Sequence, residues 1–275
     1  MNDAIEKVPY NHPAAPVYMG KGVVGDGRNF FYRSYWHGDI ELVCILEGNI
    51  CYSVNGETIK LTKGQSLFIN ANQIHYNFSE NMEYCEFICI TFNPLMLIDK
   101  KMAEEFIVPV LKNTSLPYYV SENRTVFDSI CEIYDKREEQ NFQLWLVGIF
   151  CKLWAELSKE FDGSAQYIKK SEMESFKKMM WYIRENYKTK ITLKQIAEAG
   201  NVCKSGCNEI FNKYTGLTPI NYLNDYRLRQ SILLMNTDMN IMQICLETGF
   251  SGASYFAEIF KKQYGISPNK YRSTL

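Results

Sequence analysis

The sequence predicts an α+β protein in two parts, an antiparallel β part followed by an all-α part. Three observations predict this division. Short apolar or alternating runs, separated by turn residues, fill most of residues 29–92. From residue 121 onward the apolar spacing changes to the period of a helix. A pair of short helical patterns then occurs twice, in residues 192–219 and 240–268.

The β part is predicted from short strands and their turns. An aromatic cluster comes first, followed by a nearly continuous apolar run at residues 41–48 and an alternating run at 50–54. Asn55-Gly56 follows at once and predicts a hairpin with a type I′ turn. The cluster is Phe30, Phe31, Tyr32, Tyr35 and Trp36, and further strands are expected at residues 59–61, 66–70 and 87–92. Short antiparallel strands at this spacing predict a sandwich or a small barrel.

Two amphipathic helices are expected after the strands. Residues 95–112 are partly helical in this interpretation, and residues 117–120 are extended. The apolar stripes expected to face the sheet are Val126, Phe127, Ile130, Ile133 and Tyr134 in the first helix, and Leu144, Val147, Cys151, Trp154 and Leu157 in the second. Asp162-Gly163-Ser164 reads as a linker. We therefore place one domain at residues 1–162 and another at residues 171–275.

The second domain is predicted to contain helices only. Helix Met173–Asn186 should bury Phe176, Met179, Met180 and Ile183. Thr192 with Gln195, and Asn240 with Gln243, have the spacing of capping boxes. A helix is expected at residues 204–214, and a long one at 219–236 that packs with Tyr222, Tyr226 and Leu233 and exposes Arg227 and Arg229. Gly249 suits a left-handed turn between two short helices.

The strongest signal in this domain is an internal repeat. Leu193, Ile196 and Ala197 recur 48 residues later as Ile241, Ile244 and Cys245. Phe211, Gly216 and Pro219 recur 49 residues later as Phe260, Gly265 and Pro268. Two short helices joined by a tight turn make a helix-turn-helix unit. Chance explains one such pair more easily than two copies.

The repeat, above all GFSGASYFAEIFKKQYGISPNKYR at residues 249–272, resembles the double helix-turn-helix of AraC/XylS-type transcriptional regulators. The likeness covers residues 171–272. WHGDIELVCILEGN and LTKGQSLFINANQIH, at residues 36–49 and 61–75, resemble the cupin-type sensor domain of the same family. The resemblance implies a cupin-like antiparallel β-barrel with a helical pair for effector sensing and dimerisation, and an all-α DNA-binding domain whose two helix-turn-helix units are joined by a long helix.

The same resemblance implies partners. They are double-stranded DNA, a small-molecule effector such as a sugar or another metabolite, a second copy of the chain, and RNA polymerase if the protein is an activator. The chain has no apolar stretch near the ~20 residues of a membrane span and begins without a signal peptide. We therefore expect a cytoplasmic protein without a membrane partner.

A small-molecule pocket is expected in the barrel. Cupins elsewhere hold a metal with three His and one Glu, but here the matching positions offer His37, Glu41 and His75, and Tyr35 replaces the other His. With at most three ligands, we expect no metal and no cofactor. Tyr35, Trp36, His37, Glu41 and His75 are instead expected to line a site for an organic effector. Hydrogen-bonded residues at the barrel rim are the simpler interpretation of the two histidines.

The resemblance also assigns DNA contacts. Base-facing candidates are Ser205, Asn208 and Glu209 in the first unit, and Ala253, Ser254, Ala257 and Glu258 in the second. Phosphate-contacting candidates are Lys204, Lys213, Lys261 and Lys262, with Arg272 as a further one. Glu209 and Glu258 stand where the family often has Arg, which favours a different base preference. Gly206 weakens the first recognition helix by about 1 kcal/mol, so the first unit should bind more loosely or become ordered on DNA.

Charge and cysteines agree with this division. Residues 1–169 hold 15 Lys and Arg against 22 Asp and Glu, a net charge of −7. Residues 170–275 hold 15 against 9, a net charge of +6, which suits a polyanion partner. The nine cysteines are scattered in apolar runs without a CxxC pair, which indicates core packing more than metal or redox chemistry.

The sequence is compatible with three functions. The leading one is an effector-responsive DNA-binding transcription regulator. The second is a metal-dependent cupin enzyme with an appended helical module, which would need a complete metal shell. The third is a protein-interaction module whose repeat has lost DNA binding. We find no nucleophile-and-base arrangement and no phosphate-binding loop, and therefore expect no catalytic residues.

Overall fold

The computed structural model describes residues 8–25, 34–79, 83–161 and 170–274, and the chain forms two compact units, Met1–Ile168 and Lys169–Leu275. The linker expected at Asp162–Ser164 and the aromatic residues Phe30–Tyr32 lie outside the described residues. In the part of the chain that the structure describes, no helix is both long enough and apolar enough to span a bilayer.

Unit 1 is built on two antiparallel sheets that share one long strand, β2 (Ile40–Val54). In the first sheet β2 pairs with β6 (Cys85–Phe92) and β4 (Ser66–Ile69), and β1 (Val17–Val24) and β7 (Tyr118–Ser121) form its outer strands. In the second sheet it pairs with β3 (Glu57–Thr62) and β5 (His75–Phe78). The strand passes between the sheets at a bulge and at Gly48, whose φ is +73°.

The hairpin predicted at Asn55-Gly56 is confirmed. Both residues have positive φ, 52° and 83°, as a type I′ turn requires. The strands expected near residues 59–61, 66–70 and 87–92 are present as β3, β4 and β6. Sequence reasoning missed β1 and β5, and it read the continuous strand β2 as two runs.

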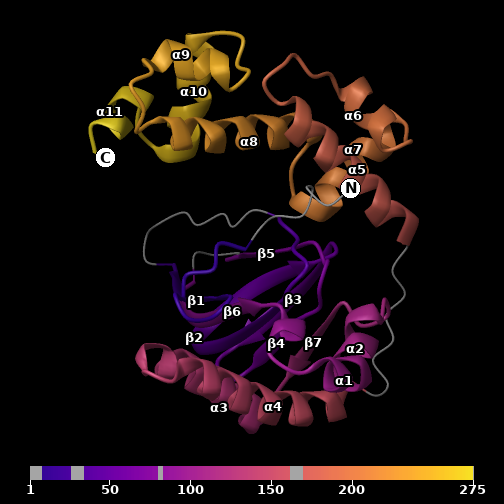
Figure 1. Ribbon diagram of the computed structural model, residues 1–275. Coiled ribbons are helices and arrows are strands. Elements are labelled where there is room, and N and C mark those ends of the chain that lie inside the picture. The colour runs from indigo at the N-terminus through magenta and orange to yellow at the C-terminus, as the bar shows by residue number, and fades with distance from the viewer. Residues whose placement is uncertain (1–7, 26–33, 80–82, 162–169, 275) are drawn as a thin grey trace. The chain divides into compact units, whose positions relative to one another are not determined.

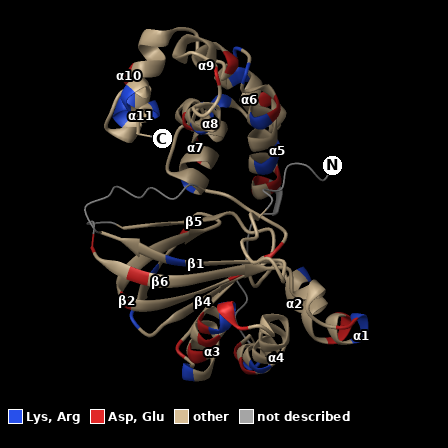
Figure 2. Cartoon of the chain, turned by 60° about the vertical axis from the view of Figure 1, so that its left-hand side comes forward, with Lys and Arg blue, Asp and Glu red and all other residues tan. Residues whose placement is uncertain are grey.

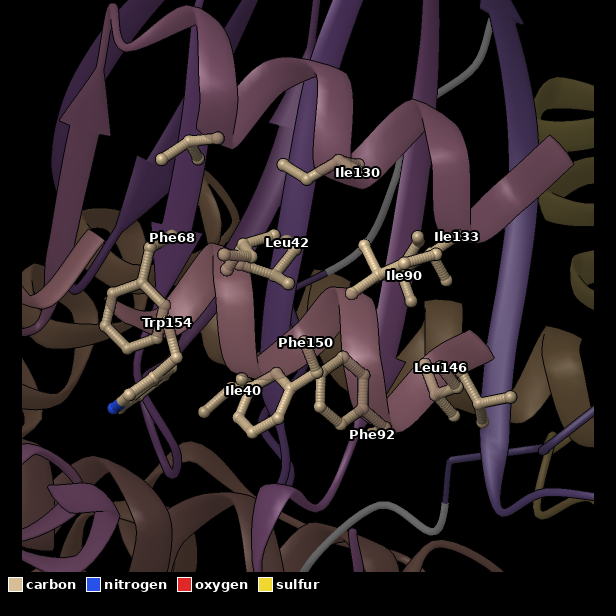
Figure 3. Close-up of a cluster of buried hydrophobic side chains, with 14 of the residues drawn as sticks. Ile40, Leu42, Phe68, Ile90, Phe92, Ile130, Ile133, Leu146, Phe150 and Trp154 are labelled. Atoms are coloured by element: carbon tan, nitrogen blue, oxygen red, sulfur yellow. The ribbon is translucent and has the colours of Figure 1, made fainter. Parts of the chain in front are cut away.

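Helices cover one face of the first sheet. Between β6 and β7 lie the short helices η1 (Pro94–Met96), α1 (Lys100–Met102), η2 (Ala103–Ile107) and α2 (Val108–Lys112). After β7 come α3 (Arg124–Asp135), η3 (Lys136–Glu138) and α4 (Phe142–Glu160). Figure 1 shows α3 and α4 side by side across the sheet. Residues of β2, β4 and β6 meet residues of both helices in one buried cluster (Figure 3), drawn with Leu42, Phe68, Ile90, Ile130 and Phe150 among its members.

The stripe predicted for α3 is confirmed at Val126, Phe127, Ile130 and Ile133, but the stripe predicted for α4 is correct only at Trp154 and Leu157. The face of α4 on the sheet consists of Phe142, Leu146, Ile149, Phe150, Leu153, Trp154 and Leu157. Leu144, assigned to that stripe, is 74% exposed. Because α4 is apolar on more than one side, its periodicity alone could not select the buried face.

Unit 2 contains seven helices among the residues described. They are α5 (Lys170–Asn186), α6 (Leu193–Ala199), α7 (Lys204–Thr215), α8 (Pro219–Leu234), α9 (Ile241–Glu247), α10 (Ala253–Tyr264) and α11 (Pro268–Arg272). Both capping boxes are present, at Thr192 with Gln195 and at Asn240 with Gln243. The inner face predicted for α5 is confirmed, since Phe176, Met179, Met180 and Ile183 are all fully buried.

Candidate functional site: a buried carboxylate with two histidines, and two recognition helices

A buried polar cluster lies inside unit 1. Along β2, Ile40, Leu42 and Cys44 face the helices, so strand alternation directs Glu41 to the opposite side, inside the unit. The Glu41 carboxylate lies 3.3 Å from His75 Nε2 and 3.7 Å from His37 Nε2. One ligand atom from each of the three residues lies within 4.8 Å of the others. All three side chains are buried.

Backbone carbonyls hold both imidazoles. His37 Nδ1 lies 3.1 Å from the carbonyl oxygen of Asp39, and His75 Nδ1 lies 3.0 Å from that of Gln73. A carbonyl oxygen only accepts, so each Nδ1 carries a proton and each Nε2 is directed toward Glu41. Each Nε2 can then bind a second proton and donate to the carboxylate, or offer its lone pair to a cation. His37 Nε2 has no hydrogen-bond partner among the described atoms.

The charges in this cluster shift its pKa values. Burial opposes the ionised form of Glu41, but the charge of His75 and the contacts of Glu41 with His37 and His75 outweigh it and hold the pKa of Glu41 below its usual value. Burial opposes protonation of His37, but its contact with Glu41 raises its pKa overall. Burial and the nearby Glu41 raise the pKa of Tyr35. The site therefore favours a charged carboxylate beside at least one imidazolium or cation.

The structure brings four of the five predicted pocket residues together around Glu41. Tyr35 donates a hydrogen bond to Glu41 (3.3 Å), and its ring packs edge-on against His75. Trp36 is buried, with 2% of its surface exposed. His37 and His75 therefore lie in a buried polar cluster with Tyr35 and Glu41, whereas the simpler interpretation placed the two histidines at the barrel rim.

Sequence reasoning missed three further polar side chains in this interior, those of Tyr52, Asn77 and Thr91. Thr91 pairs with Glu41 across β6 and β2 and donates to its carboxylate at 3.4 Å. Asn77 pairs with Tyr52 and donates to its hydroxyl at 3.2 Å. A polar residue inside an apolar strand, as Thr91 is in FICITF, is the signal that could have identified it.

The donor set fits a divalent cation. Two imidazole nitrogens and a carboxylate oxygen form a His, His, Glu set that transition metals accept, and the carbonyl contacts at each Nδ1 fix the ring orientation as outer partners of metal ligands do. The buried Nε2 of His37, which has no hydrogen bond and lies 3.7 Å from the Glu41 carboxylate, is the observation that carries this fit. Cys89 lies near Glu41 but is not part of the three-residue cluster.

The recognition helices α7 and α10 present the residues predicted to read DNA. Ser205 and Glu209 of α7 are exposed, and Asn208 is half-buried. Ser254 and Glu258 of α10 are exposed as well, and Ala253 and Ala257 are half-buried. The opposite face of each helix is in the core, with Phe211 and Tyr214 in one and Phe256 and Phe260 in the other. Both sets therefore lie on outward faces of equivalent helices.

Two of the basic residues already have partners in the protein. Lys213 donates to Glu172 at 2.6 Å, and Arg272 donates to the carbonyl oxygen of Met235 at 3.1 Å. Lys204, Lys261 and Lys262 are exposed, and the last two lie in the final turn of α10. In Figure 2 the ribbon at α10 and α11 is blue at its Lys and Arg residues, and Lys270 and Arg272 lie on α11.

The expectation that Arg227 faces out is wrong. Its guanidinium is buried and donates to the carbonyl oxygens of Tyr187 (2.8 Å) and Thr189 (2.7 Å), just after α5. Leu233, expected to pack, is 71% exposed. Periodicity cannot place an Arg that finds carbonyl partners in the interior, because a long polar side chain is assigned to the surface by default.

Two helix-turn-helix units joined by α8, with polar residues on the outward faces of α7 and α10, and a β unit with a buried polar cluster define a DNA-binding regulatory protein of two domains. Comparison with known proteins agrees. Residues 196–274 match the family model described as a helix-turn-helix domain, and residues 28–91 match the one described as a cupin domain.

Similar proteins along nearly the whole chain are transcriptional regulators. The uncharacterized HTH-type regulator YdeC of Bacillus subtilis is 28% identical over 94% of this chain and 91% of its own length. The activator RhaS of Mannheimia succiniciproducens is 25% identical over 88% and 89%. A solved structure of ToxT from Vibrio cholerae covers 95% of this chain and 99% of its own, with 15% identity and a TM-score of 0.48. Along most of its length the chain is therefore similar to HTH-type transcriptional regulators, with a cupin domain at residues 28–91 and a helix-turn-helix domain at residues 196–274.

Proposed function

We propose that unit 2 reads two successive major grooves, with α7 in one and α10 in the other. The observation that carries the proposal is that the two helices are equivalent members of a repeat and both direct polar residues outward. The net charge of +6 over residues 170–275 supports a polyanionic partner. Successive major grooves on one side of B-DNA are roughly 34 Å apart, one helical turn.

Specificity and affinity are assigned to different residues in this proposal. Ser205, Asn208 and Glu209 of α7, with Ala253, Ser254, Ala257 and Glu258 of α10, face the bases. Lys204, Lys261 and Lys262 contact phosphates. Lys213 also contacts a phosphate, which requires its ion pair with Glu172 to open. Glutamate accepts from the amino group of cytosine, so Glu209 and Glu258 favour cytosine in the strand that they face.

Salt dependence of DNA binding tests this assignment. Random-sequence selection with the full chain would supply a preferred duplex. Each phosphate contact adds about one to the slope of log affinity against log salt concentration. We expect Lys261→Ala with Lys262→Ala to reduce that slope by about 2. Lys100→Ala, at an exposed lysine of unit 1, serves as the control and should leave the slope unchanged. An unchanged slope in the double variant would remove α10 from the phosphate contacts.

Unit 1 is proposed to bind a small effector at the cluster around Glu41. Support comes from the buried polar groups of Tyr35, His37, Glu41 and His75, since few polar groups in an apolar interior are typical of small-molecule sites. A divalent cation held by the two Nε2 atoms and Glu41 would supply a Lewis-acid contact for an effector oxygen. We propose binding in place of turnover because the similar proteins are transcriptional regulators.

Thermal shift of the full chain tests the pocket. A sugar or other metabolite that binds the folded state raises the melting temperature as its concentration exceeds the Kd. Glu41→Gln, which keeps the shape and removes the charge, should abolish that shift. A metal salt tested alone separates a cation from an organic effector. Turnover of a bound compound would instead support the cupin enzyme, which is the alternative function.

A homodimer is proposed through the exposed side of α4. Leu144 is 74% exposed and Trp145 is 42% exposed, and both line an open groove of about 530 Å³ between α3 and α4. The other residues of the groove are Glu132, Asn141, Gly148, Ile149 and Lys152. Exposed apolar patches of this kind are typical of protein contacts. We further propose that the dimer works in the cytoplasm as an activator that contacts RNA polymerase.

A further inference from the structure

Two thiols meet between the first sheet and α3, outside every site described above. Cys44 Sγ, on β2, lies 3.7 Å from Cys131 Sγ, on α3, although the residues are 87 positions apart in the sequence. Cys44 is fully buried, and Cys131 is partly exposed. The pair therefore has one side that a small reagent can reach.

Packing on both sides holds the two sulfur atoms together. Cys44 follows Leu42 on the face of β2 that is directed at the helices, and Cys131 follows Ile130 on α3. Figure 3 shows Leu42 and Ile130 in the same buried cluster. A disulfide needs an S–S distance of about 2.05 Å, so the sulfur atoms must approach by about 1.7 Å for the bond to form.

The two thiols differ in their chemistry. The hydrogen bond with Cys44 lowers the pKa of Cys131, and burial only partly opposes this shift. The same hydrogen bond, followed by burial, raises the pKa of Cys44. Cys131 is thus the more acidic and the more accessible of the two thiols, which makes it the better nucleophile, and Cys44 lies beside it as the second thiol.

We propose that Cys44 and Cys131 form a reversible intramolecular disulfide on reaction with a hydroperoxide. The Cys131 thiolate attacks the O–O bond, which breaks to give a Cys131 sulfenic acid and, with the thiol proton of Cys131, water from hydrogen peroxide. Cys44 sulfur then attacks the sulfenic sulfur. The S–S bond forms, the S–O bond breaks, and the hydroxyl leaves as water with the proton of Cys44. Two thiols are oxidised and one peroxide is reduced to two waters.

The bond would join β2 to α3 covalently. β2 carries Glu41 three residues before Cys44, and α3 forms one wall of the groove that holds Leu144. Oxidation would restrain the helix against the strand that carries the carboxylate, and a dithiol reductant would release it by exchange. Formation of the disulfide does not depend on DNA binding. A missing disulfide would therefore contradict this proposal alone and would leave the proposed DNA-binding function untouched.

Counting thiols and mapping peptides test the proposal. The reduced full chain is treated with a small excess of hydrogen peroxide, alkylated under denaturing conditions and digested without reductant. We expect the number of free thiols to fall from nine to seven, a peptide joined through Cys44 and Cys131, and recovery of all nine with dithiothreitol.

Two variants make the result specific. Cys203→Ser removes the most exposed thiol and should still give the Cys44–Cys131 peptide. Cys131→Ser should remove that peptide while its circular dichroism spectrum stays that of the parent chain. The proposal is overturned if the parent chain gives no such peptide, or if its oxidised thiols map to Cys203 and to other cysteines instead.

Discussion

Gly249 shows how a single residue positions the second helix-turn-helix unit. Its φ is +81°, and a Cβ atom at this position would lie 2.1 Å from the carbonyl oxygen of Tyr187, just after α5. The turn between α9 and α10 therefore lies directly against the end of α5. Arg227 donates to the same carbonyl oxygen, so two residues from distant parts of unit 2 meet at one point.

Gly249→Ala should destabilise unit 2. The left-handed backbone costs about 1–2 kcal/mol for an L residue, and the contact with the carbonyl of Tyr187 adds to that cost. Chemical denaturation of the full chain measures the loss. Gly252→Ala, three residues away in extended backbone and with nothing within 4 Å of the added Cβ, is the matched control and should be nearly neutral. Equal midpoints for the two variants would contradict this account of the turn.

At the scale of single elements, the first recognition helix is formed despite an unfavourable sequence. α7 is a 12-residue helix with Gly206 in its first turn, and Cys203 Sγ accepts from the Gly206 amide at its N-terminus. Glycine in this position weakens the helix, and a thiol is a weak cap. α10 has no glycine between Ala253 and Tyr264. The two recognition helices therefore differ in intrinsic stability.

Gly206→Ala should stabilise α7. A Cβ atom here would meet only Cys203 Sγ at 3.6 Å and Val202 at 3.7 Å, which are ordinary contacts. We expect a gain of about 0.5–1 kcal/mol in the free energy of unfolding, and slower hydrogen exchange of α7 amides. Gly216→Ala should instead lower the free energy of unfolding, because Gly216 ends α7 in the left-handed region with φ +67°. Destabilisation by Gly206→Ala would contradict this account, because the structure leaves room for the added Cβ atom.

The elements that sequence patterns identified are those in which one local signal decides. The Asn55-Gly56 turn, the capping boxes and the buried face of α5 are of this kind. β1 was missed because Gly20 and Gly22 interrupt its alternation, although Gly22 leaves room for the ring of Phe87 on β6. β5 was missed because its inward residues, His75 and Asn77, are polar.

The candidate pocket was predictable only in part, because some of its residues are brought together by strand pairing between distant segments. His37, Glu41 and His75 stand out as titratable residues in apolar surroundings. Thr91 and Asn77 reach the same interior only through strand pairing with Glu41 and Tyr52, which depends on register between distant segments. A register of this kind is not visible in a single sequence.

At the scale of the whole molecule, each unit exposes a surface that it does not use internally. Unit 1 leaves Leu144 and Trp145 open on α4, and unit 2 leaves the outward faces of α7 and α10. A regulator that dimerises through one unit and binds DNA through the other accounts for both surfaces. Two chains would then present four recognition helices, which raises the effective concentration of each pair near DNA.

Leu144→Glu with Trp145→Glu should separate the proposed dimer. Two charges would replace exposed apolar side chains that line the groove, and in the proposed two-fold dimer like charges would face each other. Sedimentation velocity of the full chain should then report a monomer, while the circular dichroism spectrum stays unchanged. Lys112→Glu, at the end of α2 and outside the groove, is the control and should sediment as the same oligomer as the parent chain. A dimer that persists in the double variant would place the interface elsewhere.

Hydroxyl-radical footprinting of the full chain on its selected duplex tests the central claim most directly. The structure predicts two protected stretches for each bound chain, on the same side of the duplex and roughly 10 base pairs apart, one for α7 and one for α10. Glu258→Arg should alter the base preference in only one of the two stretches. A single protected stretch for each chain, or protection without sequence preference, would contradict the account of two recognition helices on one chain.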